Sequence, residues 1–113
     1  MTADNPKKQL EQLFDAAVSA VSGRQVVSNA IAKDAPFSPS LIIAVGKAAV
    51  GMTLGALDEW PDCAALVITK YGHVSDEFDA FQNVKVIESA HPVPDENSLF
   101  AGKQLIDLSL IHI

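Results

Sequence analysis

Lys47 is the residue of this sequence best placed for chemistry. It follows Gly46 at the end of the apolar run "LIIAV" (residues 41–45), and small residues that favour a helix come after it. A glycine after a strand lets the backbone turn tightly and approach a ligand. The free N–H groups of a helix start attract an anion, and Lys47 adds a full positive charge. The Gly46–Lys47 pair therefore predicts an anion-binding turn; the alternative is a solvated lysine at a helix start.

Two other loops carry ionisable side chains. In "TKYGH" (residues 69–73), Lys70 or His73 could contact a carboxylate or a phosphate, and Gly72 permits the turn, although an ordinary polar loop is the alternative. In "HPVPD" (residues 91–95), two prolines stiffen the chain around His91, which is either an ordinary loop histidine or a site residue. Asp95 is better explained as the N-cap of the next helix.

The elements around these loops alternate between strands and helices. Continuous apolar runs predict buried strands at residues 41–45 and 64–69, and a third, more alternating strand covers residues 84–89. A helix is expected from about Lys47 to Glu59, and another from Asp95 into the apolar tail "LSLIHI", where it stops after a few turns. This order predicts an α/β fold with a mainly parallel sheet and flanking helices. Since ligands collect at the carboxyl ends of such strands, the three loops should converge on one rim.

The first third of the chain is predicted to form two helices followed by a linker. Apolar residues recur at steps of three and four in "NPKKQLEQLFDAAVSAVSG", which predicts an amphipathic helix begun by Asn5 and Pro6 and closed by Gly23. A second, shorter helix is expected in "SGRQVVSNAIAK", where Ser22 and Gln25 have the spacing of a capping box. Residues 34–40, "DAPFSPS", form a linker with two prolines and two serines.

Two phosphate-binding motifs are missing. A P-loop requires a glycine where Leu41 stands and a serine or threonine where Ala48 stands. A dinucleotide fingerprint requires G-x-G-x-x-G, but the glycines here fall at 46, 51 and 55. A zinc site of Cys63, His73 and His91 lacks any recurrent ligand spacing, so no metal ligand is predicted.

The composition argues against several classes of protein. The 113 residues carry a net charge of −6 and no block of lysines and arginines, which argues against a nucleic-acid partner. Cys63 is the single cysteine, so no internal disulfide is possible. The N-terminus lacks a secretory pattern, and no apolar run reaches the roughly 20 residues that a membrane span needs. These features predict a cytoplasmic protein without membrane contact.

Three motifs in register carry a resemblance to a known family. "AVGKAAVGM", "VITKYGH" and "ESAHPVPDENS" resemble the N-terminal, MOFRL-associated domain of the glycerate 2-kinases, some of which are labelled hydroxypyruvate reductases. The resemblance covers about residues 7–108 and implies a Rossmann-like fold. It further implies ATP-dependent phosphorylation of D-glycerate at its 2-hydroxyl with Mg²⁺, in a cleft between two domains. By this resemblance Lys47 is catalytic, and Gly46, Lys70, Gly72, His73 and His91 line the cleft.

The family's chains are far longer than this one. We therefore expect residues 1–113 to form part of the N-terminal domain, with the C-terminal domain as its missing partner, or residues 109–113 not to be native. Such a chain is expected to be inactive alone, because phosphoryl transfer needs groups from all sides of the substrates. Two alternatives stay open: a non-catalytic module that binds a sugar phosphate, and an NAD-dependent hydroxypyruvate reductase, against which the missing glycine fingerprint argues.

Overall fold

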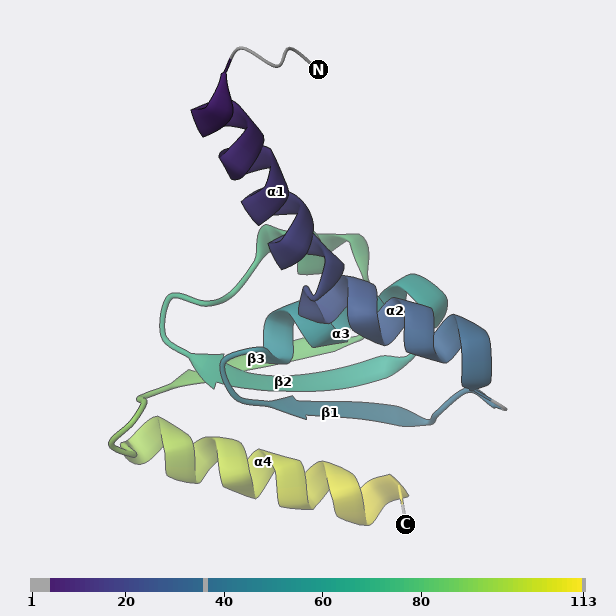
Figure 1. The fold of residues 1–113 in the computed structure, drawn as a ribbon. Helices are drawn as coiled ribbons and strands as arrows, with labels where there is room; N and C mark the ends of the chain where they lie inside the picture. Colours follow the sequence, from purple (N-terminus) through teal and green to yellow (C-terminus); the bar gives the residue numbers. More distant parts are fainter. Residues whose placement is uncertain (1–4, 36, 113) are drawn as a thin grey trace.

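Three parallel strands organise the chain (Figure 1). The computed structural model describes residues 5–35 and 37–112. In it β1 (Leu41–Val45), β2 (Ala64–Lys70) and β3 (Val84–Ser89) lie side by side in that order. The register pairs Ile43 with Leu66 and Val67 with Val86, and both pairings are parallel. The expected α/β fold and its three strands are confirmed.

Helices cover both faces of the sheet (Figure 1). α3 (Ala49–Glu59) and the short 3₁₀ helix η1 (Asp76–Ala80) lie on one face, where Leu57 and Phe78 pack against Val67. α4 (Glu96–His112) lies on the other, where Ala101 packs against Leu66 and neighbouring strand residues. Because successive residues of β2 point to opposite faces, this strand is buried throughout its centre. Burial on both faces therefore explains the apolar run of β2, as expected for a strand of a parallel sheet.

α2 (Gly23–Asp34) packs closely on α3, and glycines make the approach possible. A Cβ atom built on Gly55 would lie 2.3 Å from the carbonyl oxygen of Arg24, and one on Gly23 would lie 2.9 Å from Cγ of Met52. The prediction that Gly23 closes the first helix is wrong: it is the first residue of α2, and the helix before it ends at Ala20. Because Gly23 has no side chain, α2 can approach Met52 of α3 closely, and this glycine does not form the predicted turn.

Arg24 of α2 forms ion pairs with residues of α3 and η1 at the surface. Its guanidinium donates hydrogen bonds of 2.7 Å to both carboxylate oxygens of Asp58 in α3, and one of 2.5 Å to Glu77 in η1. The hydrogen bond from Arg24 lowers the pKa of Asp58 below its usual range. These ion pairs are partly exposed, so they orient α2 more than they stabilise the fold.

α1 (Pro6–Ala20) projects away from the rest of the molecule (Figure 1). The expected start is confirmed, because the Asn5 side chain accepts a hydrogen bond of 3.0 Å from the amide of Lys8 and Pro6 opens the helix. None of its residues is buried. The apolar stripe that predicts the helix is therefore exposed, with Phe14 67% accessible.

Several boundaries differ from the prediction. α3 begins at Ala49, which leaves Lys47 in the turn before it, and the connection from β2 to β3 holds η1, which no sequence pattern indicated. α4 continues through the apolar tail to His112, because Leu105 and Leu108 pack against the buried cluster on that face of the sheet. Ser22 caps α2 as expected by accepting a hydrogen bond from the amide of Gln25. In the part of the chain that the structure describes, no helix is long and apolar enough to cross a membrane.

Candidate functional site

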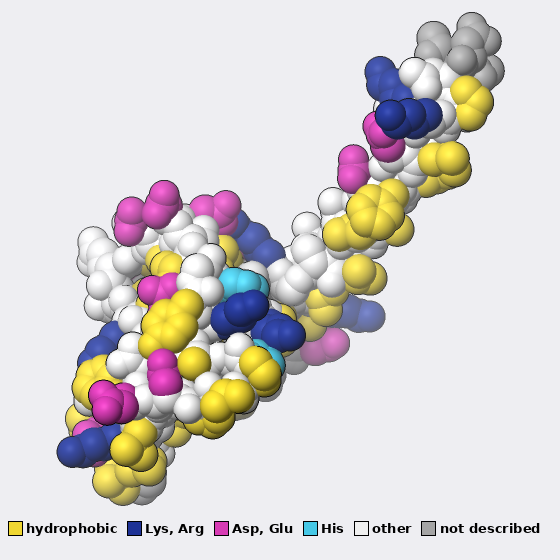
Figure 2. Space-filling model, turned by 90° about the vertical axis from the view of Figure 1, so that its left-hand side faces the viewer, with side chains coloured by type: hydrophobic (Ala, Val, Ile, Leu, Met, Phe, Trp, Pro, Cys, Tyr) yellow, Lys and Arg dark blue, Asp and Glu magenta, His cyan; other side chains and the backbone are white. Residues whose placement is uncertain are grey.

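The carboxyl ends of the three strands lie at one edge of the sheet, and the three loops of interest leave from that edge. Lysine or arginine and histidine side chains gather in the middle of this face, with acidic side chains around them (Figure 2). The expected convergence of the loops that begin at Gly46, Lys70 and His91 is confirmed. The roles of these residues stay predictions.

Gly46 makes the turn after β1. Its φ of +118° lies in the region that favours glycine. Its amide donates a hydrogen bond of 2.9 Å to the carbonyl of Ile68, and its own carbonyl accepts one of 3.0 Å from the Thr69 hydroxyl. Both bonds fix the turn to β2, so the peptide before Lys47 has a defined position.

Lys47 follows in an exposed turn at the start of α3. The N-cap of this helix is Ala48, and no side chain makes the capping hydrogen bond. The first turn of α3 therefore keeps backbone donors without a side-chain acceptor, next to a positive charge. This arrangement has the features that the sequence prediction of an anion-binding turn requires, and anion binding itself stays a prediction.

The loop after β2 is held by hydrogen bonds to β3. Gly72 has a φ of +80°, and its amide donates a hydrogen bond of 2.8 Å to the Glu88 carboxylate. The amide of Tyr71 donates to the carbonyl of Ser89 at 3.2 Å. Gly72 thus makes the predicted turn, and the role of Glu88 in holding it was not predicted, because residues 16 apart in sequence give no local signal of this contact.

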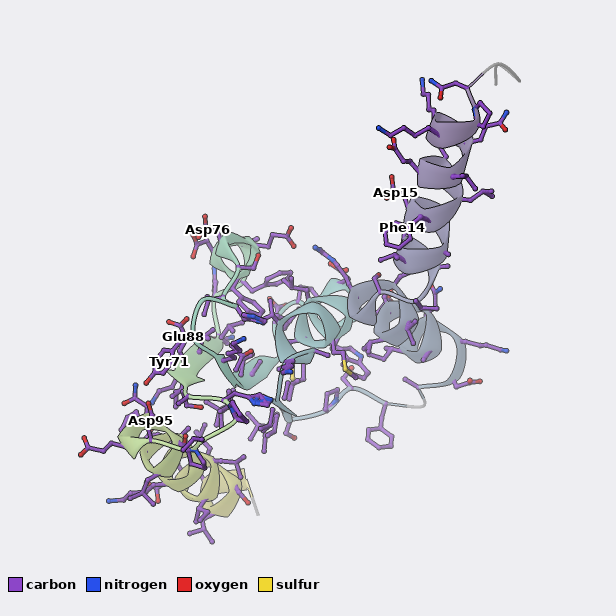
Figure 3. The ribbon with its side chains drawn as sticks, turned by 60° about the vertical axis from the view of Figure 1, so that its left-hand side comes forward. Phe14, Asp15, Tyr71, Asp76, Glu88 and Asp95 are labelled. Atoms are coloured by element: carbon purple, nitrogen blue, oxygen red, sulfur yellow. The ribbon has the colours of Figure 1, made fainter. Side chains whose placement is uncertain are left out.

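Tyr71 joins this loop to the start of α4 (Figure 3). Its hydroxyl donates a hydrogen bond of 2.6 Å to Oδ2 of Asp95 and accepts one of 2.8 Å from Nδ2 of the Asn97 side chain. Oδ1 of Asp95 accepts from the amide of Ser98 at 3.1 Å, which confirms the predicted N-cap, and from the amide of Ala90 at 3.3 Å. The hydrogen bond raises the pKa of Tyr71 and lowers the pKa of Asp95. Sequence reasoning missed this function of Tyr71.

Four ionisable side chains remain available at the rim. Lys47, Lys70, His73 and His91 are all exposed. Within residues 5–35 and 37–112, the structure assigns no hydrogen bond or ion pair to any of these four side chains. His91 precedes Pro92 through a cis peptide bond, in a loop whose two ends are joined by the hydrogen bond from the Ala90 amide to the Asp95 carboxylate. The rim can therefore offer up to four donors or positive charges to an anionic ligand.

No group of three or more histidine, cysteine, aspartate or glutamate side chains that could hold a metal occurs in the described part of the chain. Cys63 instead contacts two carbonyl oxygens, those of Pro39 and Ala64, at 3.4 Å. The carboxylates of Glu88 and Asp95 accept hydrogen bonds from Gly72 and Tyr71 in the loop after β2.

Comparison with known proteins places the chain in a family. Residues 9–110 match a family described as a domain of unknown function, DUF4147. This chain belongs to the DUF4147 family. The match covers almost the same residues as the resemblance found from the three motifs, and similar proteins carry the two expected names, so that resemblance is confirmed.

Relatives of this DUF4147 chain bear two kinds of name. A putative hydroxypyruvate reductase of Agrobacterium vitis is 30% identical over 101 residues, or 88% of this chain and 22% of the relative. A D-glycerate 2-kinase of Thermotoga maritima is 36% identical over 70 residues, or 60% of this chain and 16% of the relative. A glycerate 2-kinase of Pyrococcus horikoshii is 34% identical over 67 residues, covering 59% and 14%.

The chain thus spans less than a quarter of the length of these relatives. No solved structure matches it significantly. Similarity to the kinases supports a kinase family, whereas the reaction and the substrate belong to the proposal that follows.

Proposed function

We propose that this chain forms one wall of the active site of a glycerate 2-kinase, an enzyme that phosphorylates D-glycerate with ATP. The observation that carries the proposal is the Gly46–Lys47 turn. It joins a parallel strand to an uncapped helix at the edge where two lysines and two histidines lie exposed. The names of the Thermotoga and Pyrococcus relatives support the same reaction.

In the proposed reaction the 2-hydroxyl oxygen of glycerate bonds to the γ-phosphorus of ATP as the bond from that phosphorus to the β,γ-bridging oxygen breaks. The hydroxyl proton leaves to solvent or to a base, and ADP departs. Lys47 and the first N–H groups of α3 would stabilise negative charge on the transferring phosphoryl group. Lys70, His73 and His91 would hold the nucleotide phosphates or the glycerate carboxylate, while Gly46 and Gly72 keep the backbone close to the ligand.

Mg²⁺ is the expected cofactor beside ATP, but the residues of this chain do not fit a protein-held magnesium site. The carboxylates of Glu88 and Asp95, which contact the loop after β2, already accept hydrogen bonds from Gly72, Tyr71 and the Ser98 amide. We therefore assign no residue of this chain to the metal. The remaining groups are expected from a second domain of the same polypeptide in a cytoplasmic enzyme.

A nicotinamide-dependent reductase is the second candidate, since the Agrobacterium relative is named a putative hydroxypyruvate reductase. The glycines of α3 argue against it. Gly55 is used for close packing on Arg24 of α2, and Gly51 faces the same helix, with its Cβ position 3.7 Å from the Arg24 amide nitrogen. Neither glycine lies where a dinucleotide fingerprint would place a pyrophosphate. The non-catalytic phosphate-binding module is a third candidate.

The test is a chimera in which this chain replaces the stretch of the Thermotoga kinase that it matches. The kinase proposal predicts ADP formation that requires D-glycerate, and no oxidation of NADH by hydroxypyruvate. NADH oxidation would favour the reductase. A folded chimera that binds 2-phosphoglycerate but catalyses neither reaction would favour the phosphate-binding module.

A further inference from the structure

The Asp95 carboxylate joins three segments at the edge of the sheet where the loops meet (Figure 3). Its Oδ2 accepts a hydrogen bond of 2.6 Å from the hydroxyl of Tyr71, in the loop after β2. Its Oδ1 accepts one of 3.3 Å from the amide of Ala90, the residue after β3, and one of 3.1 Å from the amide of Ser98 in α4. An N-cap needs only the last of these contacts. The contacts with Tyr71 and Ala90 therefore do more than cap the helix.

These two contacts fix the loops that carry three of the exposed side chains of the rim. The contact at the end of β3 joins the two ends of the loop that contains His91. The bond from Tyr71 holds the loop after β2 on the same carboxylate, and Lys70 precedes Tyr71 while His73 follows it. The Asp95 carboxylate thus determines how far His91 lies from Lys70 and His73.

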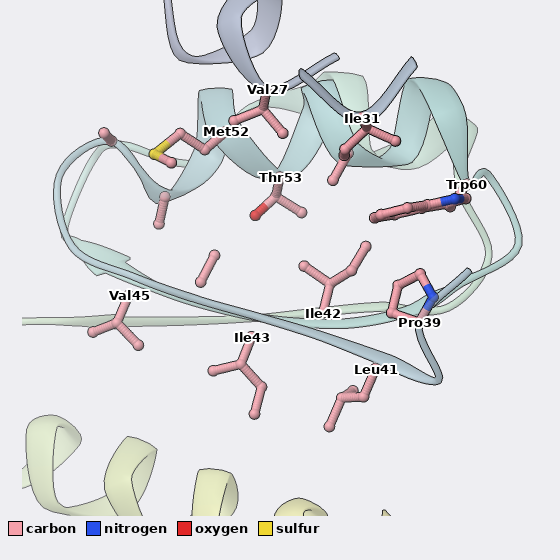
Figure 4. A pocket seen from close by; sticks show the side chains of 14 residues that line it. Val27, Ile31, Pro39, Leu41, Ile42, Ile43, Val45, Met52, Thr53 and Trp60 are labelled. Atoms are coloured by element: carbon pink, nitrogen blue, oxygen red, sulfur yellow. The ribbon is translucent and has the colours of Figure 1, made fainter. Parts of the chain in front are cut away.

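The turn that carries Lys47 is held by different contacts. Gly46 binds β2 through both its amide and its carbonyl. An apolar cavity of about 560 Å³ lies beside the turn, lined by Val45 and by side chains of α2 and α3 (Figure 4). In the part of the chain that the structure describes, neither the bonds of Gly46 nor the cavity lining includes Tyr71 or Asp95. Loss of the Tyr71 hydroxyl should therefore free the other two loops and leave the Lys47 turn in place.

The Tyr71 hydroxyl has the contacts of a group that holds the protein together. It donates its one proton to Asp95, and it accepts a hydrogen bond of 2.8 Å from Nδ2 of Asn97. The protein thus uses the proton that a substrate oxygen would need from this hydroxyl. An anion held between two loops binds more tightly when its donors are already spaced before it arrives, because ordering loops on binding costs free energy.

We propose that Tyr71 is a positioning residue, which acts through Asp95 to set the spacing of His91 from Lys70 and His73. The inference rests on the proposed function, in which these three side chains hold the nucleotide phosphates or the glycerate carboxylate. Tyr71 touches neither substrate in this role. It sets the affinity of the rim for an anion, whereas stabilisation of charge in the transition state belongs to the turn after β1.

Steady-state kinetics of the Thermotoga chimera test the proposal. Tyr71→Phe should raise KM for D-glycerate or ATP by about threefold or more, the loss expected for one hydrogen bond, and change kcat by less than about twofold. Ser75→Ala is the matched control, because it removes a hydroxyl that accepts a hydrogen bond of 3.1 Å from the Glu77 amide in the same connection. This control should leave both constants unchanged. An unchanged KM for both substrates in Tyr71→Phe, or an equal rise in Ser75→Ala, would overturn the proposal.

A double-mutant cycle separates action through Asp95 from direct contact with a substrate. Asp95→Ser keeps a capping oxygen for α4 but removes the oxygen that binds Tyr71. Adding Tyr71→Phe to Asp95→Ser should then raise KM no further. A rise by the same factor in both backgrounds would show that the hydroxyl acts on the substrate itself, against the proposal.

If the chimera catalyses no reaction, the proposed function fails and binding decides this inference. The probe is 2-phosphoglycerate, titrated into the isolated chain while the ring signals of His73 and His91 are followed by NMR. Half-saturation should need about threefold more 2-phosphoglycerate in Tyr71→Phe than in the wild-type chain, and Ser75→Ala should match the wild type. Equal affinity in Tyr71→Phe, or no response of the wild-type rings, would refute the positioning role.

Discussion

The Tyr71 hydroxyl donates a hydrogen bond of 2.6 Å to Oδ2 of Asp95 and so joins the loop after β2 to the start of α4 (Figure 3). The bond needs a neutral phenol and a charged carboxylate. It therefore couples the geometry of two loops at the candidate site to their protonation.

The first prediction is a pH window for this contact. The pKa of Asp95 is lowered in the folded chain, so its contribution to stability is present above the ordinary carboxyl pKa of about 4 and is lost as the pH falls through the lowered value. The pKa of Tyr71 is raised, so its contribution is present below about 10 and is lost as the pH rises through the raised value. Carboxyl NMR titration should show the Asp95 pKa rising toward its ordinary value in Tyr71→Phe. An unchanged Asp95 pKa would contradict the contact.

The second prediction uses two glycines of one helix. Gly55→Ala places a Cβ 2.3 Å from the Arg24 carbonyl oxygen, so α2 and α3 must separate, at a cost of roughly 1–3 kcal/mol in the free energy of unfolding. Gly51→Ala is the matched control, because its Cβ would lie 3.7 Å from the Arg24 amide nitrogen. Alanine should stabilise that position by about 0.5–1 kcal/mol. Denaturant unfolding of both variants measures the difference, and equal effects would contradict the close packing.

The third prediction concerns α1. A variant that begins at Val21 should change the free energy of unfolding by less than about 1 kcal/mol, because no residue of α1 is buried. Its tendency to self-associate should fall, since the stripe that includes Leu13 and Phe14 is removed. Thermal unfolding and light scattering test both statements. A large loss of stability would show that α1 packs on the domain in solution.

The fourth prediction concerns the role of Lys47 in catalysis. In an active chimera, Lys47→Ala should lower kcat by about 100-fold or more, roughly 2.7 kcal/mol, if the lysine stabilises charge that develops in the transition state. The thermal midpoint should hardly change, because the side chain is exposed in a turn. Lys47→Arg should not restore the rate, since a planar guanidinium differs from a compact ammonium. A normal kcat, or a variant that unfolds, would make Lys47 structural.

The fifth prediction concerns the isolated chain. It should form no ADP from ATP and D-glycerate, because one wall of a cleft cannot surround both substrates or exclude water. The measurement is a coupled ADP assay at high protein concentration, with Lys47→Ala as the background control. Turnover above that background would show that these 113 residues suffice.

The sequence by itself determined the three strands, the four α-helices and the edge on which the loops meet. Continuous apolar runs indicated strands covered on both faces, and the α/β order made them parallel, so their carboxyl ends had to share one edge. Asp95 could be recognised as a cap because capping depends on residues only three apart. Local and periodic signals were sufficient for these features.

Only the tertiary structure decided which side chains meet across the fold. The contacts of Tyr71 with Asp95, and of Gly72 with Glu88, join residues 24 and 16 positions apart, a separation at which no periodicity operates. The role of Gly23 was misjudged because a glycine beside a helix end can serve a turn or a close contact, and only the position of Met52 distinguishes the two. The amphipathic pattern of α1 likewise predicted its helix but not its partner. Burial of an apolar stripe depends on what the rest of the chain brings against it.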